Sequence, residues 1–178
     1  MDRHHEMIFE SLYDTFKRYR TLQTNTIYSL PIVILMPHSS CNCRCVMCDI
    51  WKANQHLKQL TEKDIEELLK ALKKFNTKQV LMSGGEALLH PAFFSLCRIL
   101  KKQGIAVTLL STGLTVKHYA EDILLHTDEL IVSLDGDYDL HDTIRNIPGA
   151  FEKLKKGVAL LKLLRPTFPV SGRTVIHQ

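Results

Sequence analysis

Short apolar runs alternate with amphipathic segments along most of this chain, and this alternation constrains its fold more than any other feature. Between the apolar runs, apolar residues recur at helical spacing. The expected strands are residues 32–36, 79–83, 106–110, 129–133 and 170–176, and the expected helices are residues 61–75, a segment from Pro91 to Gly104, residues 116–125 and residues 150–164. Such alternation is typical of right-handed βαβ units and predicts an α/β fold with a parallel sheet.

The ends of these segments carry their own signals. Ile32–Met36 is an unbroken apolar run flanked by prolines, the pattern of a strand buried on both faces. Thr61 can cap the helix over residues 61–75, with Asp64 at its N3 position. Ahead of the first strand, we expect a helix over residues 6–20 and a polar connector over residues 21–29. We therefore divide the chain into an N-terminal helical leader, residues 1–29, and a main domain, residues 30–178.

Composition and charge exclude several classes of function. The 178 residues suffice for one domain with a hydrophobic core, and the contents of 45% hydrophobic and 24% charged residues are ordinary for a globular protein. A net charge of +4 without a run of like charge predicts neither nucleic-acid nor membrane binding. The longest apolar run contains Pro31 and is far shorter than the ~20 residues of a membrane span. Residues 1–6 lack the apolar stretch of a secretory signal, so we expect a cytoplasmic protein.

Unusual residues follow four of the predicted strands. Cysteines follow the first strand, Gly84-Gly85-Glu86 the second, Ser111-Thr112-Gly113 the third and Asp135-Gly136 the fourth. Because ligands of parallel α/β folds bind at the carboxyl ends of the strands, these four motifs are expected to converge on one edge of the sheet.

The cysteine loop predicts a metal centre. Of the five cysteines, Cys41, Cys43, Cys45 and Cys48 fall within eight residues, and this odd, crowded set favours metal over disulfides. The spacing C-x3-C-x2-C of Cys41, Cys45 and Cys48 suits a [4Fe–4S] cluster with one iron left open. Cys43 could instead be a fourth ligand, closing the cluster or completing a zinc site, and a structural or redox role for the thiols is a third alternative. Cys97 lies on the apolar stripe of its helix and is expected to be a buried structural thiol.

Three motifs then carry a family resemblance. The segment from Cys41 to Trp51 resembles the cluster loop of the radical S-adenosylmethionine (SAM) superfamily. Ser83-Gly-Gly-Glu86 with His90-Pro91 resembles the second-strand SAM motif of that superfamily. Ser133-Leu-Asp-Gly136, with Arg145, is similar to the fourth-strand region of its peptide-modifying branch, to which SPASM proteins belong. The match covers residues 30–178.

The resemblance implies a fold and an activity. The fold is a partial (β/α)6, TIM-like barrel, truncated after about the fifth strand, so that residues 30–178 are an incomplete core domain. The activity is reductive cleavage of SAM at a [4Fe–4S] cluster on Cys41, Cys45 and Cys48, giving a 5′-deoxyadenosyl radical that abstracts hydrogen from a substrate. The implied partners are an electron donor such as flavodoxin or ferredoxin and a peptide or small-molecule substrate.

The resemblance also assigns residues to SAM. Gly84 and Gly85 would let backbone approach the ligand, and Glu86 with nearby carbonyls would receive the SAM ammonium group. Ser133 and Arg145 would bind the SAM carboxylate, and Asp135 would contact the ribose or brace its loop. Met47, where the family often has an aromatic residue, and Ser111, with Thr112, would complete the pocket.

The sequence departs from the family pattern in length, because later adenine contacts and the sixth βα unit are missing. Two further classes of function therefore stay open. One is a non-catalytic iron–sulfur or SAM-binding fragment, inactive alone. The other is an α/β binding protein that holds zinc.

Overall fold

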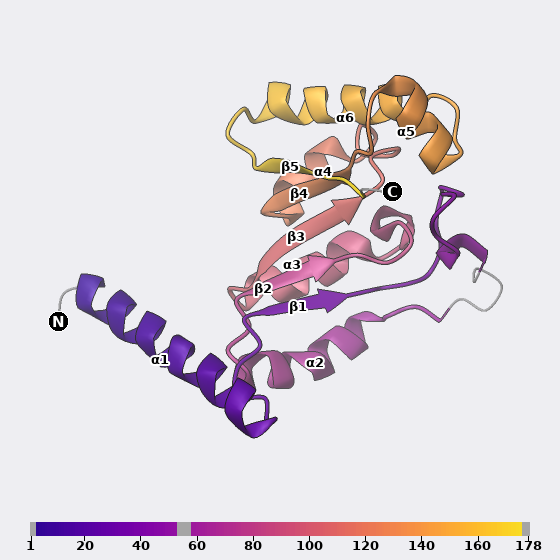
Figure 1. Ribbon diagram of the computed structural model, residues 1–178. Coiled ribbons are helices and arrows are strands. Elements are labelled where there is room, and N and C mark those ends of the chain that lie inside the picture. The colour runs from indigo at the N-terminus through magenta and orange to yellow at the C-terminus, as the bar shows by residue number, and fades with distance from the viewer. Residues whose placement is uncertain (1–2, 53–57, 176–178) are drawn as a thin grey trace.

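The computed structural model describes residues 3–52 and 58–175, with only the backbone described for residues 3–11. Five parallel strands form one sheet in the order β1-β2-β3-β4-β5. They are β1 (Ile32–Leu35), β2 (Gln79–Met82), β3 (Ala106–Ser111), β4 (Glu129–Ser133) and β5 (Val170–Arg173). Each strand pairs with the next one along the chain, which brings all their carboxyl ends to one edge (Figure 1). The prediction of a parallel α/β fold is confirmed.

Helices cover the outer face of this sheet (Figure 1). They are α2 (Glu62–Lys74), α3 (Phe93–Lys102), α4 (Ala120–His126) and α6 (Ala150–Leu164), with a short 3-10 turn, η2 (Ala87–Leu89), between β2 and α3. Alternate strand residues such as Val80, Met82 and Leu109 are fully buried against apolar helix residues, among them Ile65 and Phe93. The predicted capping box of α2 is present, because the Thr61 side chain and the Asp64 carboxylate each accept the other's amide. Cys97 is fully buried on α3, as predicted.

Three boundaries differ from the sequence prediction. The helix α4 begins at Ala120 rather than 116, and α3 begins after Pro91 rather than at it. The strand β5 ends at Arg173, and Ile176, the predicted end, lies outside the described residues. These segments begin or end in turns, where an apolar run and a regular backbone need not coincide.

The N-terminal helix is longer than predicted. The helix α1 runs from Arg3 to Thr24, so it includes residues expected in the polar connector. It extends away from the sheet (Figure 1), and near its middle the Asp14 carboxylate accepts a hydrogen bond from the Asn76 side chain at 2.9 Å. The helix is mostly exposed, so apolar periodicity is a weak guide to where it begins and ends.

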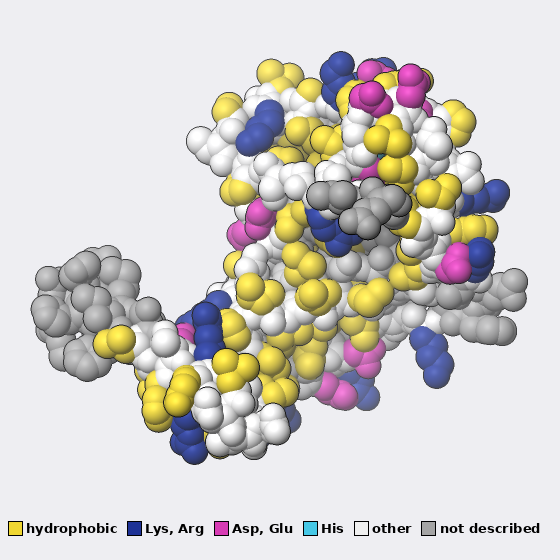
Figure 2. Space-filling model, in the orientation of Figure 1, with side chains coloured by type: hydrophobic (Ala, Val, Ile, Leu, Met, Phe, Trp, Pro, Cys, Tyr) yellow, Lys and Arg dark blue, Asp and Glu magenta, His cyan; other side chains and the backbone are white. Residues whose placement is uncertain are grey.

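The first strand is not buried on both faces, contrary to the prediction. Ile32 and Ile34 are 58% and 63% exposed, whereas Val33 and Leu35 pack against the core. The strand is at the edge of the sheet, and the helices lie on only one of its faces. Figure 2 shows the hydrophobic side chains that gather on the uncovered face.

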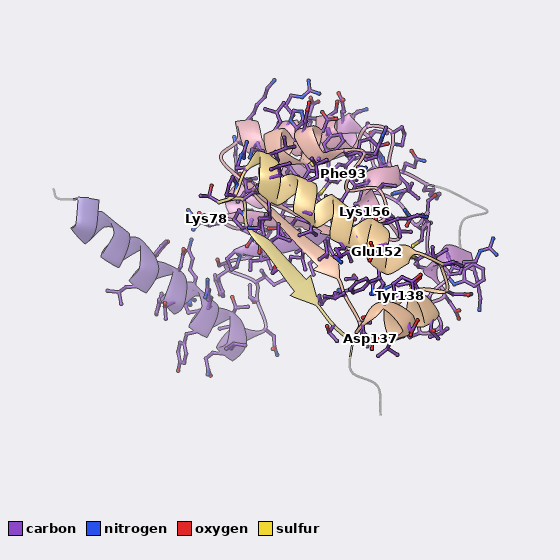
Figure 3. The ribbon with its side chains drawn as sticks, turned by 90° about the horizontal axis from the view of Figure 1, so that it is seen from above. Lys78, Phe93, Asp137, Tyr138, Glu152 and Lys156 are labelled. Atoms are coloured by element: carbon purple, nitrogen blue, oxygen red, sulfur yellow. The ribbon has the colours of Figure 1, made fainter. Side chains whose placement is uncertain are left out.

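One helix between β4 and α6 was not predicted. The helix α5 spans Tyr138–Arg145, with Asp137 as its N-cap and Asn146 in a left-handed conformation at its end. Figure 3 shows Asp137 and Tyr138 at the start of α5, beside the first turn of α6. The Asp142 carboxylate joins the two helices by accepting hydrogen bonds from the amides of Gly149 and Phe151.

None of the helices in the described residues combines the length and apolar character that crossing a bilayer requires.

Candidate functional site

A cavity of about 410 Å³ lies at the carboxyl edge of the sheet. All the predicted site residues except Glu86 and Asp135 line it, namely Cys41, Cys45, Met47, Cys48, Gly84, Gly85, Ser111, Ser133 and Arg145. They come from the loops after β1 and β2, the ends of β3 and β4, and the end of α5. The convergence expected from parallel topology is therefore observed.

Three of the four loop cysteines face this cavity. Cys41, Cys45 and Cys48 line it, whereas Cys43 does not and is only 1% exposed. The Cys43 amide donates a hydrogen bond to the Cys41 sulfur at 3.4 Å. The C-x3-C-x2-C spacing selects Cys41, Cys45 and Cys48. The structure sets the same three cysteines apart from Cys43.

The electrostatics of the loop distinguish Cys41 and Cys45 from Cys43. A hydrogen bond from the Cys43 side chain lowers the pKa of Cys41, and the same interaction, with the charge of Arg145, lowers the pKa of Cys45 to about 6. Sharing hydrogen bonds with these two neighbours raises the pKa of Cys43. Because the thiolate is the form that binds metal, Cys41 and Cys45 are prepared as ligands while Cys43 keeps its proton.

The donor set suits a cluster. Within residues 3–52 and 58–175, no three or more His, Cys, Asp or Glu side chains are arranged to hold a metal ion. The thiolates of a [4Fe–4S] cluster each bind a different iron, so they lie farther apart than the ligands of one ion. Cys41, Cys45 and Cys48 line one cavity and so supply the three thiol donors that a cluster with one open iron needs.

The cysteine loop is held by the end of α5 and packs against Trp51. The end of α5 accepts two of the loop's amides, from Arg44 to the Arg145 carbonyl at 3.3 Å and from Val46 to the Ile144 carbonyl at 3.0 Å. Beyond the cysteines, Trp51 lies near the Arg44 guanidinium, 5.9 Å from ring centre to carbon, as expected for a residue that packs against the loop.

The two glycines after β2 lie close to the backbone of the segment just before Cys41. Gly84 has a φ of +119°, and a Cβ at Gly85 would lie 2.1 Å from the Ser40 carbonyl oxygen. The Glu86 amide donates to that same carbonyl at 2.8 Å, and the His38 ring bonds the Glu86 carbonyl at 2.9 Å. The glycines allow a close backbone approach, as the sequence suggested, but the segment approached includes residues 38–40, just ahead of Cys41.

The carboxylate of Glu86 does not reach the cavity. It is fully buried and accepts hydrogen bonds from the Ser111 hydroxyl at 3.0 Å, from the Thr112 amide at 2.7 Å and from the Leu88 amide at 3.2 Å. Burial raises its pKa, against the effect of these donors. In this structure the Glu86 carboxylate ties the end of β2 to the end of β3.

The carboxylate of Asp135 lies behind the cavity wall. It pairs with the Arg145 guanidinium at 2.5 Å, and both residues are at least 94% buried. The pair therefore lies inside the protein rather than on its surface. Of the two roles predicted for Asp135, the structure places it where it braces the loop.

Some cavity residues had no sequence signal assigned to them. Ile50, Leu110, Arg173 and Val175 also line the cavity. Arg173 and Val175 follow from the rule that binding residues collect at the carboxyl ends of strands, applied to the fifth strand, where no motif had been recognised.

Known proteins resemble this chain over most of its length. The family model of the Radical SAM superfamily matches residues 35–177. The AdoMet-dependent heme synthase of Methanosarcina barkeri (strain Fusaro / DSM 804) is 28% identical over 144 residues, 79% of this chain and 41% of that protein. The pyruvate formate-lyase-activating enzyme of Clostridium pasteurianum is 36% identical over 104 residues, 53% of this chain and 42% of that enzyme. The chain thus spans about two fifths of the length of these relatives.

Solved structures share the fold. Streptococcus suis SuiB bound to precursor peptide SuiA superimposes with a TM-score of 0.73 at 18% identity, over 96% of this chain and 38% of SuiB. SuiB bound to S-adenosylmethionine gives a TM-score of 0.67 at 17% identity, over 98% of this chain and 39% of that one. With the family model covering most of its residues, the chain belongs to the radical SAM superfamily.

Proposed function

We propose that this chain carries the catalytic cluster site of a radical SAM enzyme, with a [4Fe–4S] cluster on Cys41, Cys45 and Cys48. The observation that carries the proposal is the sorting of the cysteines: these three line the cavity and Cys43 does not. When bound, the reduced cluster would supply one electron to SAM, releasing methionine and a 5′-deoxyadenosyl radical that abstracts hydrogen from a substrate.

The chain's own residues would bind SAM and shape the cavity. Ser133 and Arg145 both line the cavity and are the donors suited to the SAM carboxylate. The backbone at Gly84 and Gly85 forms part of the cavity wall beside the cysteine loop, and the Met47 side chain provides apolar cover. Glu86 supports this wall from behind through Ser111 and Thr112 rather than by touching SAM.

The partners follow from this chemistry. A one-electron donor such as flavodoxin or ferredoxin would reduce the cluster. The substrate would be a peptide or a small molecule, and the likeness to SuiB, solved with its precursor peptide, favours a peptide. We assign residues 30–178 to the core domain and residues 1–29 to an N-terminal helical leader.

SAM cleavage tests the proposal. The purified chain is reconstituted anaerobically with iron and sulfide, then given SAM and dithionite, and 5′-deoxyadenosine is measured by liquid chromatography. We expect about four irons per chain and 5′-deoxyadenosine that requires both the cluster and the reductant. A reduced cluster that leaves SAM intact would instead favour the non-catalytic module, and zinc without iron or sulfide would favour the zinc protein.

A further inference from the structure

We propose that Asp135 is a positioning residue that holds Arg145 against the sulfur of Cys45, and that this pair sets the reduction potential of the cluster. The inference rests on the proposed function, because it concerns the cluster that Cys45 would ligate. It adds a residue that does not line the cavity and a task that differs from binding SAM.

The contact chain is continuous and buried. One amino group of Arg145, Nη2, lies 2.5 Å from the Asp135 carboxylate, and the other, Nη1, donates to the Cys45 sulfur at 3.6 Å. Arg145 is 6% exposed, Asp135 4% and Cys45 9%. Because the guanidinium is a rigid planar fork, fixing Nη2 on the carboxylate also fixes the direction in which Nη1 points.

Asp135 is itself fixed by three elements. It lies two residues past the end of β4, and its amide donates a hydrogen bond to Nδ1 of His141, a fully buried residue of α5, at 3.3 Å. Its carboxylate also accepts the amide of Val175, just after β5, at 3.3 Å. The Asp135 carboxylate therefore has little freedom to move. The Arg145 guanidinium paired with it is held in a fixed position as well.

Arg145 is anchored to the same loop by its backbone. Its carbonyl accepts the Arg44 amide, and the carbonyl of Ile144 accepts the amide of Val46, which flank Cys45 on both sides. The end of α5 thus approaches Cys45 through two backbone bonds and one side-chain bond. A side chain that only fills the core has no reason to place a charged group on the sulfur of Cys45, as Arg145 does.

The charges predict opposite effects for the two partners. Reduction adds a negative charge to the cluster, so a nearby positive charge favours it and a negative charge opposes it, strongly where water is excluded. Asp135 neutralises most of the charge of Arg145. Asp135→Asn keeps a side-chain oxygen that can accept from Nη2, so it removes the negative charge while the guanidinium stays in place and should raise the reduction potential. Removing the guanidinium should lower it.

The test is a redox titration of reconstituted protein, followed by the electron paramagnetic resonance (EPR) signal of the reduced cluster. We expect Asp135→Asn to raise the midpoint potential, Arg145→Gln to lower it, and the double variant to lie between them. Asp139→Asn is the matched control, because it makes the same charge change on the exposed face of α5 and should leave the potential unchanged. Equal potentials in all variants, or shifts of Asp135→Asn and Arg145→Gln in one direction, would overturn the inference.

Loss of the cluster in a variant is also informative. If Asp135→Asn binds little iron, Asp135→Glu, which restores the charge, should recover it. If both variants keep the wild-type circular dichroism spectrum and neither holds iron, Asp135 has only a structural role and the inference fails. A wild-type chain that cleaves SAM while the Asp135 variants keep its potential would reject the inference and leave the proposed function standing. A wild-type chain without iron would reject both.

Discussion

Replacing Cys41, Cys45 or Cys48 singly with serine will remove most of the iron from the reconstituted protein and reduce 5′-deoxyadenosine formation to background. A serine hydroxyl keeps its proton at neutral pH and is a poor ligand for iron. The two remaining thiolates are then too few to hold the cluster. The loss should exceed the ~10–100-fold that removal of a partner behind a metal ligand typically costs. Iron and acid-labile sulfide per chain, measured beside the 5′-deoxyadenosine yield, check this.

Two other cysteines provide the controls. Cys43→Ser keeps a hydroxyl that can donate to the neighbouring sulfurs, and Cys97→Ser changes a thiol buried in α3 far along the chain from the loop. Both variants should retain most of their iron. If Cys43→Ser loses iron as completely as Cys45→Ser, Cys43 is a ligand and the cluster has no open iron.

Gly85→Ala should destabilise the protein by about 3 kcal/mol and also impair iron uptake. The new Cβ would lie 2.1 Å from the Ser40 carbonyl oxygen, so the backbone just before Cys41 must move, and overpacking of this kind costs ~1–3 kcal/mol or more. The free energy of unfolding of the metal-free chain, from urea titration, measures the first effect, and iron per chain measures the second.

Gly172→Ala is the matched control for this substitution. Nothing lies within 4 Å of a Cβ at Gly172, so its stability and iron content should match those of the wild type. Equal stability of the Gly85→Ala and Gly172→Ala variants would show that the loop before Cys41 is not held against the glycine pair.

Much of the fold could be predicted because burial and periodicity agree there. The strands β2, β3 and β4 are apolar runs ended by turn residues, and the stripe on α3 from Phe93 to Leu100 is the face that the core buries. Parallel topology then places the strand ends together without any knowledge of contacts. This is why the cavity-lining cysteines and glycines could be identified from the sequence.

The helix α5 could not be predicted in the same way. Its buried residues are His141, Ile144 and Arg145, whereas Tyr138 and Leu140 are exposed. A search for an apolar stripe therefore finds the wrong face. The polar residues are buried because they contact the end of β4 and the cysteine loop, and those partners are remote in sequence.

The direction of a side chain at a turn is equally hidden from the sequence. Glu86 and Asp135 were both correctly placed at the carboxyl edge, yet each carboxylate points to a protein partner rather than to the cavity. A turn motif fixes where the backbone goes. Which way its carboxylate points depends on donors from other elements, here Thr112 just after β3 and Arg145 at the end of α5.

The central claim is that three cavity thiolates leave one iron open to SAM. EPR spectra of the reduced protein, recorded with and without SAM, test this most directly, with SAM carrying ¹⁷O in its carboxylate to report contact. We predict that SAM changes the spectrum of the cluster and that the labelled carboxylate shows a hyperfine coupling to it. An unchanged spectrum at saturating SAM, or the absence of any iron signal, would contradict the account.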